Sequence, residues 1–192
     1  AIDWDVLVFL GGMFVVGEGL YRSGYLATRS AQLFAGAKTT GGLVARIVLI
    51  TGGLSALLMN DTVAIIATPL MIHFSRVCRV DVRLLLLALA FSITTGSVLS
   101  PVGNPQNLLI AVQSGMPDAF GTFLAGLILP TLLALGLVWG VLRLGWIKEY
   151  NQALKLDGLG HIADTRLAQA SSLGVALALA AIAVRMLAAW LG

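Results

Sequence analysis

Three consecutive polar residues in the middle of an apolar segment constrain the fold of this chain more than any other feature. The stretch Thr51–Leu70 is TGGLSALLMNDTVAIIATPL, with Asn60, Asp61 and Thr62 at its centre. Hydrocarbon tolerates such a triplet only where the backbone turns and the polar groups face a cavity within protein. A carboxylate in the middle of a membrane segment is by default a candidate functional group. The sequence therefore predicts a turn at 59–62 with a functional site around it.

The composition is typical of a polytopic membrane protein. Of the 192 residues, 58% are hydrophobic and only 11% are charged, and the mean hydropathy is +0.95. The isoelectric point near 9.4 reflects an excess of Lys and Arg. In a membrane protein, the position of these residues indicates which loops face the cytoplasm. The basic composition therefore does not imply a nucleic-acid partner, and none is expected. The single cysteine, Cys78, excludes an intramolecular disulfide and offers no metal-site spacing.

The length of the apolar segment Gly41–Arg76 predicts a hairpin that enters and leaves the membrane on the same side. One straight helix of about 35 residues would be roughly 52 Å long, too long for a hydrocarbon core of about 30 Å. Two complete spans would need about 40 residues and a turn. Two shorter arms that meet at 59–62 fit the length better, so we expect a re-entrant hairpin over 41–78.

The next apolar segment, 84–114, predicts a transmembrane helix that is broken near its centre. Its middle is SITTGSVLSPVGNPQN, and Pro101, Gly103 and Pro105 cannot all lie within one regular helix. Asn104 is suited to cap the second half of the helix, and Pro105 is suited to be its first residue. We therefore expect the break at 97–105.

The remaining segments complete an all-α membrane fold. Apolar stretches of about 20 residues can span the bilayer, whereas mixed polar segments fit the interface or solvent. We expect transmembrane helices at 1–22, 120–145 and 171–192, an interfacial helix at 23–40 and a cytoplasmic connector at 146–170. Glu18 precedes Arg22 by four residues, so it is expected either to form an i,i+4 ion pair or to carry a coupling proton.

The distribution of charge supports the re-entrant hairpin. With 41–78 entering and leaving on one side, 11 of the 12 Lys and Arg residues fall on one face, and only Arg185 does not. The opposite face holds Asp3, Asp5 and Asp118. This asymmetry predicts a multi-pass inner-membrane protein with cytoplasmic Lys- and Arg-rich loops. A single crossing would leave mixed charge on both faces.

Two interruptions in consecutive elements would bring four helix ends near the middle of the bilayer. Helix N-termini carry free N–H groups that favour an anion, whereas C-terminal carbonyls favour a small cation. Discontinuous helices in secondary transporters use both kinds of end. Asp61 is expected to bind a cation, to carry a coupling proton or only to cap its helix. The neutral oxygens and amides near the interruptions come from Asn60, Thr62, Ser97, Ser100, Asn104 and Asn107.

Two motifs resemble those of the ion transporter superfamily. Met59–Thr62, followed by an apolar arm that ends in Thr68–Leu70, resembles the hairpin-tip motif, and Gly96–Asn107 resembles the signature of the broken helix. Ile2–Met13 resembles the start of the preceding span, so the similarity covers most of 2–145. The sodium-coupled dicarboxylate and citrate permeases are the most similar branch. Their usual Ser-Asn-Thr tip is Asn-Asp-Thr here, which is nearer to the arsenite-efflux and sodium/proton-antiport branches.

The resemblance implies one of two inverted repeats of an elevator-type transporter that moves a small anion with Na⁺ or H⁺. It also implies a homodimer in the lipid bilayer, and a missing C-terminal half, since only one repeat is present. By position, it implies substrate binding by Asn60, Thr62, Asn104 and Asn107, and the neutral hydroxyl of Ser100 adds a fifth predicted substrate-binding residue. From the oxygen atoms at the two interruptions, we expect cation or proton coupling by Asn60, Asp61, Ser97 and Gly103, with Na⁺ near Asn60, Asp61 and Asn104. No cofactor is expected beyond the coupling ion.

Other classes of function fit the sequence less well. An intramembrane aspartyl protease needs two carboxylates that share a proton, and Asp61 has no partner at comparable depth. The sequence contains no His-Glu-x-x-His, Gly-x-Ser-x-Gly or Cys–His pattern, so we expect no catalytic residue and no enzyme activity. An ion channel would use similar broken helices and stays an alternative.

Overall fold

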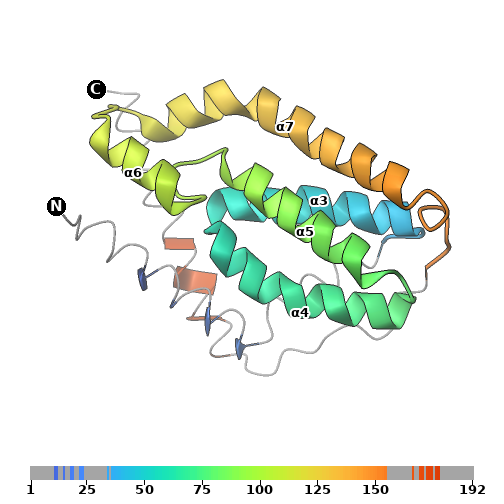
Figure 1. Ribbon diagram of the computed structural model, residues 1–192. Coiled ribbons are helices and arrows are strands. Elements are labelled where there is room, and N and C mark those ends of the chain that lie inside the picture. The colour runs from blue at the N-terminus through green and yellow to red at the C-terminus, as the bar shows by residue number, and fades with distance from the viewer. Residues whose placement is uncertain are drawn as a thin grey trace.

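The computed structural model describes residues 36–154 continuously, together with 11, 12, 15, 18, 19, 22, 23, 34, 166, 169, 170, 172–174, 176 and 177. The described chain is all-α. Its helices are α3 (Thr40–Leu57), α4 (Asn60–Cys78), α5 (Val82–Ser97), α6 (Pro105–Gln113) and α7 (Ala119–Gly145) (Figure 1). Within the described residues, the one β-type pairing is an isolated bridge between Thr39 and Ala153.

Several predictions concern parts of the chain that lie outside the described residues. These are most of the helices expected at 1–22, 23–40 and 171–192, most of the connector at 146–170, and the positions of Asp3, Asp5 and Arg185. Glu18 and Arg22 are described. The predicted i,i+4 ion pair between them is confirmed, with Arg22 Nε 2.6 Å from Glu18 Oε1.

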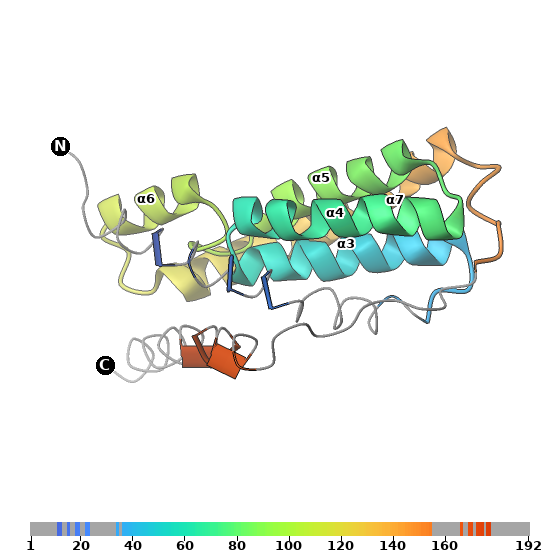
Figure 2. The same ribbon diagram turned by 90° about the horizontal axis from the view of Figure 1, so that it is seen from below.

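Helices α3 and α4 form an antiparallel hairpin (Figures 1 and 2). Helix α3 begins after Thr39, whose side chain accepts a hydrogen bond from Gly42 N (3.1 Å). It ends at Leu57. The next residue, Leu58, has an extended backbone, and α4 begins at Asn60. The polar triplet is therefore the first turn of α4, and Leu58 and Met59 make the turn itself.

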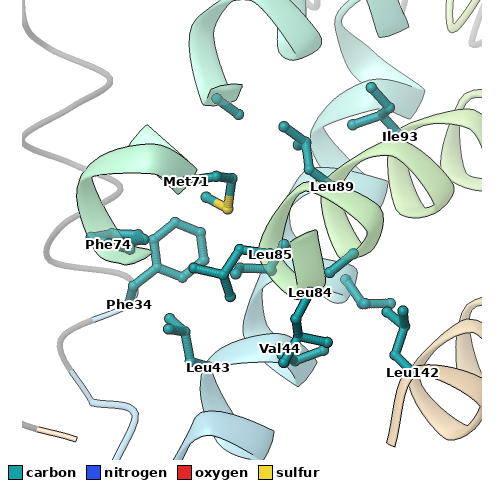
Figure 3. Close-up of a cluster of buried hydrophobic side chains, with 14 of the residues drawn as sticks. Phe34, Leu43, Val44, Met71, Phe74, Leu84, Leu85, Leu89, Ile93 and Leu142 are labelled. Atoms are coloured by element: carbon teal, nitrogen blue, oxygen red, sulfur yellow. The ribbon is translucent and has the colours of Figure 1, made fainter. Parts of the chain in front are cut away.

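Helix α5 packs against both arms of the hairpin. Its buried residues recur at intervals of three and four, which is the spacing of one helix face: Leu84, Leu85, Ala88, Leu89, Ser92, Ile93 and Gly96. Figure 3 shows the apolar core along this face, where Leu84, Leu85, Leu89 and Ile93 lie beside residues of α3 and α4. Phe34 closes the core with an edge contact to Phe74, at 5.4 Å between ring centroids. Truncation of one such buried Leu to Ala typically costs about 2–5 kcal/mol.

Small and hydroxyl-bearing residues hold α3 close to α5. Thr51 Oγ1 lies 2.7 Å from Ser92 Oγ, and Ser55 Oγ donates to the carbonyl of Ile93 at 2.8 Å. A Cβ added to Gly96 would collide with the backbone of Gly52. In membranes, close packing of backbones and hydrogen bonds from hydroxyl groups commonly hold helices together, because hydrophobic burial contributes little to helix association there.

Helix α7 is the longest helix of the described chain, and much of its surface is exposed. Its 27 residues would extend about 40 Å, and most of its apolar side chains are exposed. By length and composition, α3 and α7 are the two described helices that are able to cross a membrane, and α5 is a shorter apolar helix.

Charged residues gather at the end of the bundle where α3 and α5 begin and α4 and α7 end (Figure 1). Hydrogen bonds join these elements: Trp146 Nε1 donates to Asp81 Oδ2 at 3.0 Å, and Thr40 N donates to Gln152 O at 3.0 Å. The Trp146 bond, with a second from Arg83 N, lowers the pKa of Asp81. Burial raises the pKa of Tyr150 to about 12. The cations at this end are Lys38, Arg46, Arg76, Arg79, Arg83, Arg143 and Lys148.

Candidate functional site: the junction of the hairpin tip and the helix break

The hairpin tip lies against the break between α5 and α6 (Figures 1 and 2). Asn60 N, at the start of α4, donates to Gly103 O at 2.9 Å. Ser100 Oγ donates to Ala56 O, near the end of α3. The structure thus brings two polar interruptions, about 40 residues apart in the chain, into direct contact. We call this region the junction.

The hairpin tip leaves polar groups without protein partners. The residue before α4, Met59, provides no side-chain cap. Asn60 Oδ1 accepts from Asp61 N at 2.9 Å, and the Asp61 side chain is exposed. Thr62 is only 4% exposed, yet its hydroxyl has no hydrogen-bond partner in the described part of the chain. A buried polar group is normally paired, so this hydroxyl is an exception among the described residues of the tip.

At the break, side chains of Asn104 and Asn107 form hydrogen bonds with backbone groups of the same chain. Asn104 Oδ1 caps α6 by accepting from Asn107 N at 2.8 Å, and Asn104 Nδ2 lies 3.2 Å from Ser97 Oγ. Asn107 Nδ2 donates to the carbonyls at the end of α5, those of Ser97 (3.2 Å), Val98 (3.2 Å) and Ser100 (3.0 Å). The first turn of α6 therefore covers the carbonyl end of α5.

Gly103 allows the break to fold this tightly. A Cβ at this position would collide with the backbone of Ser97. Because the Gly103 carbonyl also accepts the bond from Asn60 N, a shift of this residue would disturb the hairpin tip as well.

The junction contains most of the residues predicted from the sequence. Hydrogen bonds connect Asn60 to Gly103 and connect Ser97, Ser100, Asn104 and Asn107 to one another. Asp61 and Thr62 lie in the same turn as Asn60 without joining this network. Sequence reasoning missed the Ala56 carbonyl and the Gly52–Gly96 contact, because an alanine carbonyl and two distant glycines carry no local signal.

The junction offers neutral oxygen atoms, N–H groups and one carboxylate. The described residues contain no group of three or more His, Cys, Asp or Glu side chains that could hold a metal ion. A cation here would therefore depend on Asp61 and neutral oxygens. An anion would find the first turn of α4, whose N–H groups carry partial positive charge, and the Thr62 hydroxyl.

Discontinuous apolar helices whose polar ends meet within a bundle are typical of polytopic membrane transport proteins. A citrate transporter family model (CitMHS) matches residues 1–192, and the chain belongs to this family. The family is one of transporters rather than enzymes, and two of the relatives below are named as a transporter or a putative transporter.

Three relatives show how much of the chain is similar to individual proteins. The chain is 36% identical over 141 residues to the inner membrane protein YbiR of Escherichia coli, covering 70% of this chain and 37% of YbiR. It is 35% identical over 134 residues to the silicon efflux transporter LSI3 of rice (70% and 27%). It is 32% identical over 115 residues to the putative transporter arsB of Dictyostelium discoideum (60% and 20%). The chain thus spans about a third or less of these relatives. No solved structure matches it.

Proposed function

We propose that this chain supplies one half of an ion-coupled transport site for a small anion in a larger permease of the inner membrane. The observation that carries this proposal is the buried, unpartnered Thr62 hydroxyl in the first turn of α4, beside the exposed Asp61 carboxylate. The hydroxyl and helix N-terminus would bind the anion, Asn60 would orient it, and Asp61 would bind Na⁺ or H⁺.

The re-entrant placement of the hairpin is part of the proposal. Its arms of 18 and 19 residues are each about 27–29 Å long, and they begin and end at the cation-rich end of the bundle. Each arm is nearly as long as the hydrocarbon core of about 30 Å, so the proposal requires the arms to begin outside that core or to tilt within it. With the cation-rich end in the cytoplasm, the tip would then lie within the membrane, beside the break. The 27-residue α7 would then cross the whole bilayer.

The remaining parts of the site would come from outside this chain. An inverted second repeat would provide a second hairpin and break, as the superfamily resemblance implies, and two copies of the protein would form a homodimer. The lengths of the relatives, which exceed the matched region about threefold or more, support the presence of further segments.

A second candidate function is arsenite efflux or Na⁺/H⁺ antiport. The acidic residue at the tip, Asp61, favours it, and so does the similarity to a putative transporter named arsB and to an efflux transporter. An ion channel is the third candidate. Channel flux would need no gradient of a second ion and would not show counterflow.

Substitution of Thr62 by Val tests the binding role of its hydroxyl. In proteoliposomes containing the full-length protein, we expect counterflow of radiolabelled citrate, sulfate or arsenite to weaken roughly 10- to 100-fold for the transported species, the loss of one hydrogen bond to a charged ligand. Thr68→Val is the matched control, because the Thr68 hydroxyl is already bonded to Ala64 O at 2.7 Å. Equal transport by Thr62→Val and Thr68→Val would refute the assignment.

Substitution of Asp61 by Asn tests coupling. We expect anion uptake to lose its dependence on an imposed Na⁺ or pH gradient, because the amide neither ionises nor attracts a cation as a carboxylate does. Asp118→Asn is the control, since Asp118 is an aspartate whose side chain accepts from Gly121 N at the start of α7. If uptake and its ion dependence survive unchanged in Asp61→Asn, Asp61 is only a helix cap.

A further inference from the structure

The carbonyl end of α5 is occupied by amide donors. At a broken helix, unpaired C-terminal carbonyls are the groups expected to coordinate a small cation. Here the carbonyls of Ser97, Val98 and Ser100 all accept from Asn107 Nδ2, within 3.0–3.2 Å. Ser97 O also lies 3.4 Å from Asn104 Nδ2. The position in which a cation would find oxygen ligands is therefore filled by N–H groups.

The orientation of the Asn107 amide follows from its surroundings. All three neighbours are carbonyl oxygens, which only accept, so the NH₂ group must face them and the amide oxygen must face away. The backbone of Asn107 is held by the Asn104 cap, and Pro105 starts α6 at the residue after that cap. The first turn of α6 therefore fixes the amide in place before any ligand binds.

We propose that Asn107 is a positioning residue whose amide takes the place of a cation at the end of α5, so that the coupling ion of this half binds outside the break. The inference rests on the proposed transport function and gives Asn107 a role other than substrate binding. The α5 carbonyls do not fit Na⁺ while the amide is present. The acidic group left for the coupling ion in the described junction is Asp61, on the hairpin side.

Sodium-dependent thermal stability of the full-length protein tests this proposal without a transport assay. Tm is measured in NaCl and in choline chloride at equal ionic strength, for the wild type, Asn107→Asp and Asn107→Ala. Asn107→Asp replaces the donor by a carboxylate beside three carbonyls, so we expect a sodium-specific rise in Tm of about 2–4 °C beyond that of the wild type. Asn107→Ala should melt at a lower temperature but keep the sodium-specific shift of the wild type or exceed it.

Control variants make the outcomes distinct. Gln113→Glu adds the same charge at the exposed far end of α6 and should behave as the wild type. Asn107→Ser is a second variant without the amide, and it should keep the sodium-specific shift of the wild type or exceed it, as Asn107→Ala should. A sodium-specific shift lost in either of these variants, or no gain in folded Asn107→Asp, would overturn the proposal. The transport test on Thr62 can succeed or fail independently, because it uses a different readout.

Discussion

The hairpin tip and the helix break contact each other, but they differ in hydrogen bonding. Side chains form hydrogen bonds with the backbone at the break, whereas the tip keeps a buried hydroxyl that has no partner in the described part of the chain. At the break, Asn104 caps α6 and Asn107 covers the carbonyls that end α5. At the tip, the cap position is held by Met59, which has no polar side chain, and the Thr62 hydroxyl is buried without a partner. Two interruptions that look alike in composition therefore differ in how completely their polar groups are paired.

This difference separates a supporting element from a binding element. An unpaired buried polar group costs about 1–3 kcal/mol, so the hydrogen bonds of Asn104 and Asn107 at the break favour a rigid platform there. A ligand that forms a hydrogen bond with the Thr62 hydroxyl would offset this free-energy cost. Among the described residues, Thr40 also has a buried hydroxyl without a hydrogen-bond partner. Thr40, however, lies at the charged end, fully buried, with its N–H bonded to Gln152 O.

The largest expected effect comes from replacing Gly103 by Ala. The added Cβ would collide with the backbone of Ser97, which cannot move without breaking the amide bonds that close the break. We expect a loss of about 3 kcal/mol or more, the upper range for overpacking, seen as a lower Tm or loss of the folded peak in size-exclusion chromatography. Gly53→Ala is the control, because nothing lies within 4 Å of its added Cβ. Equal stability of the two variants would show that the break is not the rigid element.

The comparison also shows which parts of the molecule are predictable from the sequence. Helix ends followed from local chemistry: Pro105 with Asn104 before it is a strong start signal, and α6 begins there. The two-arm division of 41–78 followed from length and polarity, and the structure has two helices on either side of Met59. The expectation that these arms re-enter the membrane stays a prediction.

The hydrogen-bond partner of each polar group could not be predicted from the sequence. An asparagine side chain carries both a donor and an acceptor, so the pattern indicated that Asn107 lies at the break without indicating which end faces what. Which end of the Asn107 amide faces the carbonyls depends on how the first turn of α6 folds back over the end of α5. Likewise, the contact between Gly52 and Gly96 depends on the rotation of two helices about their axes, which residue spacing alone leaves open.

The smallest expected effect, and the most direct comparison of open with closed pairing, comes from two Thr→Val substitutions. Thr51→Val removes a hydroxyl that lies 2.7 Å from both Ser92 Oγ and Ile47 O, so it should destabilise the ligand-free protein by about 0.6 kcal/mol, the average for such bonds in membranes. Thr62→Val removes an unpaired hydroxyl and should leave Tm unchanged or slightly raised. Thermal unfolding in detergent without substrate measures both. If Thr62→Val lowers Tm as much as Thr51→Val, the tip is as closed as the break, and the Thr62 hydroxyl is paired within the protein rather than reserved for a ligand.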